Sequence, residues 1–307
     1  MKIVFMGTPD FAVPSLEGLI QAGHTVCGVF CQPDKPVGRH QNKLQAPPVK
    51  KAAQAHGIPV FQPTKLRDGT ALEQLEKLNP DLIVVAAYGR ILPDEILNLP
   101  PNGCINVHSS LLPKYRGAAP INWAVINGEK ETGVTIMYMA TELDAGDIIA
   151  QAATPIDPEE SVETLHDRLA RLGSSLLVKT VADLAAGTAS RTPQDPAQAT
   201  FAPLLSRALS PIDWTRSARE IHNQVRGLVP WPATSTDIFH GETVKIFAVQ
   251  ETGADTEQTP GTILSAGNAG IDVACGDGKV LRVTELQAPG SRRMAAADYL
   301  RGHPIDR

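Results

Sequence analysis

Several features that would assign this 307-residue chain to a common class are missing from its sequence. The longest apolar run, about Leu82 to Ala87, is far shorter than the roughly 20 residues of a membrane-spanning helix. The opening residues MKIVFMG are too short for the apolar core of a secretion signal. The chain has few cysteines, and none has the close spacing of a metal site, so we expect buried thiols and a reduced, cytoplasmic setting: Cys27, Cys31, Cys104 and Cys275.

The usual nucleotide-binding fingerprints are also missing. Residues 7–12 read GTPDFA after an apolar run, where a dinucleotide-binding turn needs G-x-G-x-x-G. No Walker A sequence occurs. An NAD-dependent dehydrogenase is therefore disfavoured.

Charge is distributed unevenly along the chain. The net charge of −5 disfavours capture of nucleic acid by the whole surface, and residues 205–307 are almost balanced. Segment 33–51 differs, because it has one acid, Asp34, against five basic side chains, and its prolines and glycine predict a loop. Such a loop suits phosphate contacts, although an ordinary solvated loop has the same composition. The five basic residues are Lys35, Arg39, Lys43, Lys50 and Lys51.

Short apolar runs alternate with helical patterns through the first part of the chain. We expect helices at 12–22, 70–78 and 161–186. We expect strands at 2–6, 24–32, 58–61, 81–87, 103–108, 132–139 and 147–153. The alternation predicts an α/β fold, a Rossmann-like, mostly parallel sheet with helices on both faces.

The remainder of the chain indicates a linker and a second domain. Residues 189–206 are rich in proline and weakly periodic, which predicts a linker between a catalytic domain, 1–188, and a smaller domain, 207–307. That domain begins with an expected helix at 212–228. Expected strands with glycine-rich turns follow at 235–239, 243–249, 261–265, 270–274 and 279–286, which predicts a small β-barrel.

Polar side chains near the end of the expected strand 103–108 indicate a site. Asn106 and His108 lie two residues apart and therefore share one face of the strand. Burying them unpaired costs roughly 1–3 kcal/mol each, so they either form hydrogen bonds in the core or line a cleft. Ligands bind at the carboxyl ends of parallel strands. Asp144, before Gly146, is the candidate third partner, able to orient an imidazole and keep it charged, although aspartate is also a common turn residue.

These residues carry a family likeness. The pattern Asn106-x-His108-x-Ser110-Leu111-Leu112-Pro113-x-x-x-Gly117, with Asp144-x-Gly146 further on, resembles the signature of the folate-dependent formyltransferases. The opening MGTPDFAVPSLEGL and the later REIHNQVRGLVPWPAT resemble the branch that acts on methionine esterified to initiator tRNA. The likeness covers nearly the whole chain.

The resemblance implies an enzyme that transfers the formyl group of 10-formyltetrahydrofolate, its co-substrate, to the α-amino group of methionyl initiator tRNA for translation initiation. Asn106, His108 and Asp144 are the implied catalytic residues, and no metal is required. The C-terminal domain is implied to be a tRNA-binding OB-fold, and Arg39 and Lys43 of the basic loop are implied to reach the tRNA. We expect a monomer without a membrane partner. Folate contacts are implied for Tyr88, Gly89, Ser110, Leu111, Leu112 and Pro113.

The basic loop departs from the family's usual pattern, and two alternatives stay open. The loop reads Gly38-Arg39-His40-Gln41-Asn42-Lys43, where the family usually has Gly-Arg-Gly and then more lysine. One alternative is a formyltransferase for a small amine, such as glycinamide ribonucleotide or an amino sugar, which the basic insertion and the second domain together disfavour. The other is a non-catalytic RNA-binding protein, which the intact polar trio disfavours.

Overall fold

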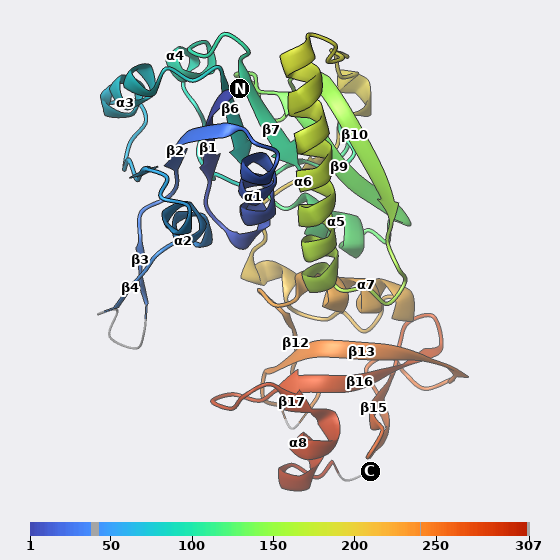
Figure 1. Ribbon diagram of the computed structural model, residues 1–307. Helices are drawn as coiled ribbons and strands as arrows, with labels where there is room; N and C mark the ends of the chain where they lie inside the picture. The colour runs from blue at the N-terminus through green and yellow to red at the C-terminus, as the bar shows by residue number, and fades with distance from the viewer. Residues whose placement is uncertain (38–42, 240, 306–307) are drawn as a thin grey trace. The chain divides into compact units, whose positions relative to one another are not determined.

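The chain forms two units, and neither is one continuous stretch of sequence. The computed structural model in Figure 1 describes residues 1–37, 43–239 and 241–305. The first unit contains Met1–Gly117, Thr132–Thr154 and His166–Ala202, and the second contains Ala118–Glu131, Pro155–Leu165 and Pro203–Arg307. The domain boundaries expected from the sequence stay a prediction, but residues 189–202 of the expected linker belong to the first unit.

A seven-stranded sheet forms the centre of the first unit. Its strand order is β10-β9-β7-β6-β1-β2-β5. The pairings β5–β2, β2–β1, β1–β6 and β6–β7 are parallel, and β7–β9 is antiparallel. The mostly parallel sheet predicted from the sequence is confirmed. The strand bounds are β1 Lys2–Gly7, β2 Thr25–Phe30, β5 Val60–Phe61, β6 Leu82–Ala86, β7 Cys104–His108, β9 Glu131–Tyr138 and β10 Ile148–Pro155.

One face of this sheet is covered by two helices, α3 (Thr70–Leu78) and α4 (Asp94–Leu97). Val4, Val85 and Cys104 from three strands belong to the same buried cluster as Leu75 of α3 and Ile96 of α4. Side chains alternate along a strand, so the neighbouring positions of β7 point to the other face.

The other face is covered by α6 (Val162–Ala186), beside α1 (Val13–Gln21), as Figure 1 shows. Gly173 allows α6 to approach β7 closely, because a Cβ at this position would lie 3.0 Å from Val107 Cγ1. Ser174 Oγ of α6 donates a hydrogen bond to Pro14 O of α1 at 2.6 Å. Helices therefore lie on both faces, as predicted.

The basic segment 33–51 is more regular than the loop that its composition predicts. A hairpin of β3 (Lys35–Val37) and β4 (Lys43–Gln45) is followed by α2 (Pro48–Ala55). Proline is tolerated on an isolated two-stranded ribbon and at the first position of a helix, where its missing N–H is not needed. Lys50 Nζ donates to Asp34 Oδ1 and Oδ2, both at 2.8 Å, so one of the five basic groups pairs at the hairpin base.

The second unit is built on an antiparallel sheet of order β12-β13-β16-β15-β14, with β17 also paired to β16. Its helices α7 (Ala218–Leu228) and α8 (Ala296–Gly302) contribute Ile221, Val225 and Tyr299 to its core. The smaller C-terminal β domain is confirmed, its sheet is antiparallel, and its closure into a barrel stays a prediction. The strand bounds are β12 Thr234–Thr236, β13 Val244–Asp255, β14 Ile263–Gly267, β15 Gly270–Ala274, β16 Lys279–Gln287 and β17 Met294–Ala295.

An additional helix, α5 (Pro120–Ile126), belongs to this second unit although its sequence lies far upstream. It packs on α7 at Gly227, where a Cβ would lie 2.5 Å from Ile126 Cγ1. Asn122 Nδ2 donates to Gly227 O at 2.8 Å. The second unit therefore needs residues from the middle of the chain.

A cross-strand ion pair joins β15 to β16 in the second unit. Asp272 lies opposite Arg282, with Nε–Oδ1 at 2.6 Å and Nη2–Oδ2 at 3.0 Å. These hydrogen bonds hold the pKa of the Asp272 carboxyl below its usual value of 3.8. Because the folded-state pKa is lowered, the ion pair stabilises the fold above that value and loses this contribution as pH falls through the folded-state pKa.

We expect Asp272→Asn to reduce the free energy of unfolding at pH 7 by about 0.5–1.5 kcal/mol, since the pair is bidentate but partly exposed. Urea unfolding at pH 7 and pH 3 measures this, and the difference from wild type should shrink at pH 3. Asp255→Asn, which removes an exposed partner of Lys279, is the matched control and should have almost no effect. Equal losses for both variants at pH 7 would contradict the expectation.

Candidate active site

Strand β7 places the two predicted polar side chains at the carboxyl end of a parallel strand. Asn106 lies opposite Val85 of β6 and Met137 of β9, and His108 lies opposite Thr135. Asn106 and His108 share the face of the sheet opposite to α6, about 7 Å apart along the strand. His108 is the last residue of β7, which is the expected place for a ligand site in such a sheet.

The buried His108 ring is held by one of its two nitrogens. Nε2 donates to Tyr115 O at 2.9 Å, and it carries a proton because a carbonyl oxygen can only accept. Nδ1 faces Asp144 Oδ2 at 3.7 Å, which is too long for a hydrogen bond. Within residues 1–37, 43–239 and 241–305, Nδ1 therefore has no hydrogen-bond partner, and it is the nitrogen available to a substrate.

Asp144 occupies the turn between β9 and β10 in a left-handed conformation, with φ +50°. Its Oδ2 accepts a hydrogen bond from Gly117 N at 2.8 Å, and its side chain is 11% exposed. Gly117 has to be glycine, because a Cβ would lie 2.7 Å from Ala202 O. Asp144 is therefore both a turn residue and the partner of His108, so the two readings of this position from the sequence are compatible.

Three polar groups at this strand end have no hydrogen-bond partner in the described part of the chain. They are the Asn106 side-chain amide, His108 Nδ1 and Asp144 Oδ1. None of the three is among the fully buried atoms that lack a partner in the described residues, so each is open to solvent or to a ligand. The Asn106 amide can donate to an oxygen that gains negative charge, and His108 Nδ1 can do so when the ring carries a proton on both nitrogens. The Asp144 carboxylate can accept a proton. The structure brings together the predicted trio, and its catalytic role stays a prediction.

The predicted folate loop 110–113 is fixed by bonds inside the protein. Ser110 Oγ donates to Lys114 O at 2.7 Å, and Ser110 O accepts from Thr135 Oγ1 at 2.7 Å. Thr135 Oγ1 also accepts from Leu112 N at 3.1 Å. The side chains of Ser110 and Leu112 are buried, whereas Leu111 and Pro113 are half-buried. Ser110 and Leu112 thus shape the loop, and of the four side chains only those of Leu111 and Pro113 are exposed enough to meet a ligand. Their contact with a folate stays a prediction.

Tyr88 and Gly89, the other predicted folate residues, differ in what they expose. The Tyr88 side chain lies in the core, and burial raises its pKa to about 12. Its carbonyl oxygen accepts from Thr8 Oγ1 at 3.3 Å and from Gln32 Nε2 at 3.1 Å. A ligand can therefore meet Tyr88 only through its backbone. Gly89 is exposed and borders a pocket of about 530 Å³ whose other lining residues are Thr64, Lys65, Leu66, Arg67, Arg90 and Ile91.

Of the two residues predicted to contact tRNA, only Lys43 lies in the described part of the chain. Lys43 is exposed on β4, whereas Arg39 lies outside the described residues. No group of three metal-ligating side chains is found among the residues that the structure describes, and none of the described helices is long and apolar enough to cross a membrane.

Sequence reasoning missed two residues that contact the Asp144 turn. Arg116 is a buried cation next to Gly117, and Gln194 lies in the expected linker. Gln194 Nε2 donates to Asp144 O and Gly146 O, both at 2.8 Å. Arg116 stood inside the recognised motif, which was a usable signal, but no local pattern distinguishes Gln194.

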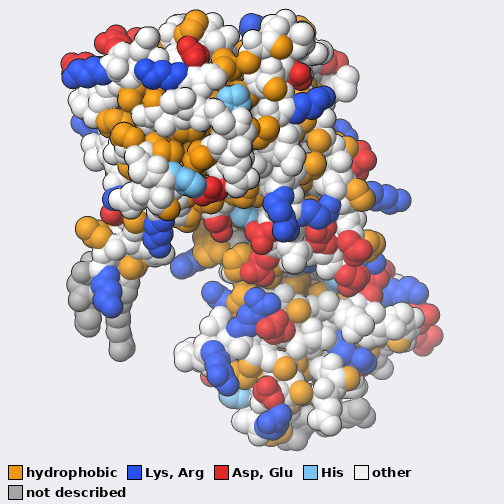
Figure 2. Space-filling model, in the orientation of Figure 1, with side chains coloured by type: hydrophobic (Ala, Val, Ile, Leu, Met, Phe, Trp, Pro, Cys, Tyr) orange, Lys and Arg blue, Asp and Glu red, His pale blue; other side chains and the backbone are white. Residues whose placement is uncertain are grey.

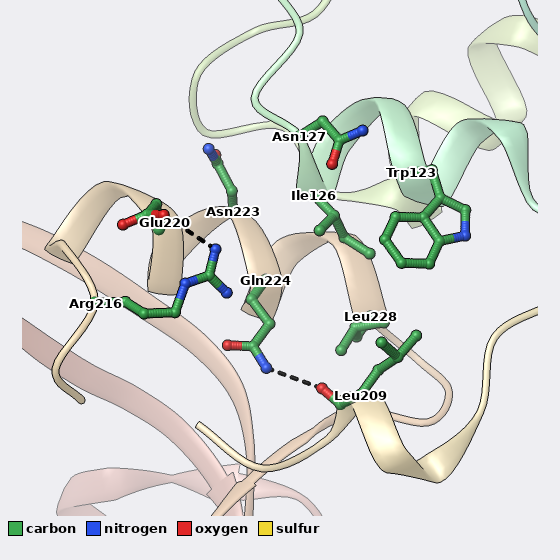
Figure 3. A pocket seen from close by; sticks show the side chains of 9 residues that line it. All are labelled: Trp123, Ile126, Asn127, Leu209, Arg216, Glu220, Asn223, Gln224 and Leu228. Atoms are coloured by element: carbon green, nitrogen blue, oxygen red, sulfur yellow. Dashed lines mark hydrogen bonds and ion pairs between the residues drawn. The ribbon is translucent and has the colours of Figure 1, made fainter. Parts of the chain in front are cut away.

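A separate pocket of about 490 Å³ lies within the second unit, between α5 and α7. Figure 3 shows Trp123 and Ile126 of α5 on one side and Gln224 and Leu228 of α7 on the other. Gln224 Nε2 donates to Leu209 O at 2.9 Å, and its buried Oε1 has no partner among the described residues. None of the site residues predicted from the sequence lines this pocket.

The sheet is covered by helices on both faces, and the site lies near the carboxyl end of β7. There the Asp144 carboxylate can accept a proton, and Asn106 and His108 can donate hydrogen bonds. This arrangement is typical of an α/β enzyme that transfers a chemical group. Residues 1–181 match the family described as formyl transferase, and residues 205–304 match the formyl transferase C-terminal domain. The chain belongs to the formyl transferase family.

Known relatives extend along the whole chain. Methionyl-tRNA formyltransferase of Halalkalibacterium halodurans is 51% identical over 98% of this chain and 95% of its own length. The protein of the same name from Pelotomaculum thermopropionicum is 53% identical over 99% of this chain and 96% of its own length.

Solved structures with low sequence identity show the same fold. An N-formyltransferase of Helicobacter canadensis in complex with folinic acid and dTDP-3-aminofucose has a TM-score of 0.68 at 19% identity, covering 94% of this chain and 99% of that one. HypX of Aquifex aeolicus in complex with tetrahydrofolic acid has a TM-score of 0.66 at 18% identity, covering 98% of this chain and 47% of that one.

We expect Asn106→Ala to lower kcat by about 10²–10³-fold, the usual loss when an oxyanion donor is removed. Thermal unfolding should stay close to wild type, because the Asn106 amide has no protein partner to lose in the described chain. The control is Asn98→Ala, which should keep full activity. Among the described residues, the Asn98 amide bonds only to Asp94 O of the helix that Asn98 caps. Wild-type kcat in Asn106→Ala would remove this residue from the reaction.

Proposed function

We propose that this chain transfers the formyl group of 10-formyltetrahydrofolate to the α-amino group of methionine on initiator tRNA. The unpaired polar groups at the end of β7 carry the proposal, because they match the needs of an amine attacking a formyl carbon. Relatives named methionyl-tRNA formyltransferase, about 50% identical over both units, support the choice of acceptor.

Asn106, His108 and Asp144 have different roles in the proposed formyl transfer. As the amine nitrogen bonds to the formyl carbon, the Asn106 amide and His108 Nδ1 donate to the formyl oxygen that gains charge. A donor of this kind typically contributes ~10²–10³ in rate. Asp144 Oδ1 accepts the proton of the amine, directly or through one water. The bond from the formyl carbon to the folate nitrogen then breaks, and that nitrogen takes up a proton as it leaves, from His108 or from the acid that Asp144 has become. The acid–base contribution is typically ~10²–10⁴. No nucleophilic serine or cysteine is needed.

The loops beside β6 and β9 suit the ring system of a folate. Ile91 is 74% exposed and Leu143 is 57% exposed, so both loops present apolar surface. Thr141 Oγ1 donates to Asp94 Oδ1 at 3.0 Å and thereby links the loop after β9 to the start of α4. Their backbone groups, with Leu111 and Pro113, would hold the folate, which supplies the formyl carbon. The folates bound to HypX and to the Helicobacter canadensis enzyme support this assignment.

The tRNA contact is assigned to the basic hairpin and to the second unit. Lys35 and Lys43 are exposed on β3 and β4, the hairpin that stands out from its unit in Figure 2. Their charges suit RNA phosphates, which position a nucleic acid without reading its sequence. A cytoplasmic location and a monomeric state are parts of the same proposal.

The direct test incubates the protein with labelled 10-formyltetrahydrofolate and one of three acceptors: methionyl initiator tRNA, glycinamide ribonucleotide or an amino sugar nucleotide. We expect label in the tRNA fraction alone, on the methionine amino group. Transfer only to a small amine would replace the proposed acceptor. Binding of tRNA with no transfer to any acceptor would favour an RNA-binding protein instead.

We expect Lys43→Ala to raise KM for the charged tRNA and to leave KM for the folate unchanged. Loss of one phosphate contact should reduce the slope of log affinity against log salt by about 1. Affinity measured at several salt concentrations gives that slope. Lys179→Ala, which removes an exposed lysine from α6, is the control. An unchanged slope in Lys43→Ala would exclude this contact.

A further inference from the structure

A buried cation lies next to the candidate site. Arg116 is 3% exposed, and its backbone is adjacent to Gly117, which binds the Asp144 carboxylate. Its Nε and Nη2 donate to Gln194 Oε1 at 3.2 and 2.9 Å, and its Nη1 donates to Glu142 Oε1 at 3.3 Å. A buried guanidinium needs such acceptors, because leaving its donors unpaired is costly.

The other end of the Gln194 amide holds the Asp144 turn. Nε2 donates to Asp144 O and to Gly146 O, both at 2.8 Å. The orientation of the amide is determined, since arginine can only donate and the two carbonyl oxygens can only accept. Gln194 therefore connects the buried cation to the backbone of the carboxylate that faces His108.

Asp144 needs this support because of its backbone. A φ of +50° is unfavourable for residues other than glycine, and aspartate is among the few that tolerate it. The turn is packed closely at Gly146, where a Cβ would lie 1.8 Å from Tyr138 O. Without the two bonds from Gln194, the turn would lose the donors that fill its two carbonyl oxygens.

The segment around Gln194 is anchored on both sides of the site. Thr192 and Ile148 exchange two backbone hydrogen bonds at 2.8 and 2.9 Å, next to the Asp144 turn. Thr200 O accepts from Arg116 N at 2.8 Å, and Thr200 Oγ1 accepts from Tyr115 N at 2.9 Å. Segment 192–200 thus contacts the loop that holds His108 and the turn that carries Asp144.

We propose that Gln194, held by Arg116, is a positioning residue for formyl transfer, which keeps the Asp144 carboxylate in place against His108. The proposal rests on the function proposed above. Gln194 contacts no reacting atom and acts only through the Asp144 turn. A displacement of about 1 Å in a catalytic group can lower the rate about 100-fold, so the effect of losing this contact should be large.

The test uses Gln194→Glu, which keeps an oxygen for Arg116 but puts a second acceptor against Asp144 O and Gly146 O. We expect kcat to fall about 10- to 100-fold, with KM for folate and tRNA within about threefold of wild type. The thermal unfolding midpoint should fall, because two carbonyl oxygens lose their donor, but the protein should stay folded because Arg116 keeps its partner. Gln198→Ala is the matched control, since Gln198 lies in the same segment and its side chain bonds, within the described parts of the chain, only to Asp195. Wild-type kcat in Gln194→Glu would overturn the proposal.

Combination with Asp144→Asn tests whether Gln194 acts through the carboxylate. If it does, the double variant should be no slower than Asp144→Asn alone, whereas fully additive losses would overturn the proposal. A readout without substrate is the ¹⁵N signal of His108 Nδ1, assigned with His108→Gln, which should shift in Gln194→Glu and not in Gln198→Ala. An unshifted signal would also overturn it. Absence of formyl transfer by wild type would contradict the proposed function instead, and the His108 signal would still test the contact.

Discussion

The hydrogen bond from Gly117 N to Asp144 Oδ2 is the contact on which the site depends. It joins the loop after β7, whose Tyr115 carbonyl holds the His108 ring, to the turn between β9 and β10. One carboxylate oxygen is used in this structural bond, and the other has no hydrogen-bond partner among the described residues. His108 is arranged in the same way, because Nε2 holds the ring through its hydrogen bond to Tyr115 O and Nδ1 faces Asp144. Rigid placement and unused hydrogen-bonding capacity are thus obtained from the same side chains.

The sequence predicts the parallel sheet and its helices because those elements depend on local patterns. Helix 70–78 was predicted to the residue, and Asn106 and His108 fall on β7 as expected. Short helices such as α4 and α5 were missed, since four to seven residues give too little periodicity to recognise. The strands β3 and β4 were missed because proline usually argues against a strand. Pro36 is tolerated here because β3 and β4 form a separate two-stranded ribbon.

The three polar residues of the candidate site could be predicted from the sequence, whereas the residues that contact them could not. Asn106 and His108 are polar residues on an otherwise apolar strand, and Asp144 lies in a glycine-containing turn. These local patterns allowed the sequence to identify them as candidates. Gln194 and Arg116 act across 78 positions of sequence, and no single-sequence pattern reports such a pairing. Tyr88 was predicted as a folate residue, yet its ring and hydroxyl lie in the core, because burial depends on neighbours that come from the whole fold.

The placement of α5 has a consequence for how such proteins can be recombined. Residues 118–131 and 155–165 belong to the C-terminal unit, although the chain on either side of them belongs to the first unit. A single genetic crossover at a linker therefore cannot exchange the C-terminal module intact, since α5 would stay behind and meet a foreign α7. The two units can therefore not be exchanged independently by one crossover. A chimera would have to carry all three segments of the second unit, or redesign the contact between Ile126 and Gly227.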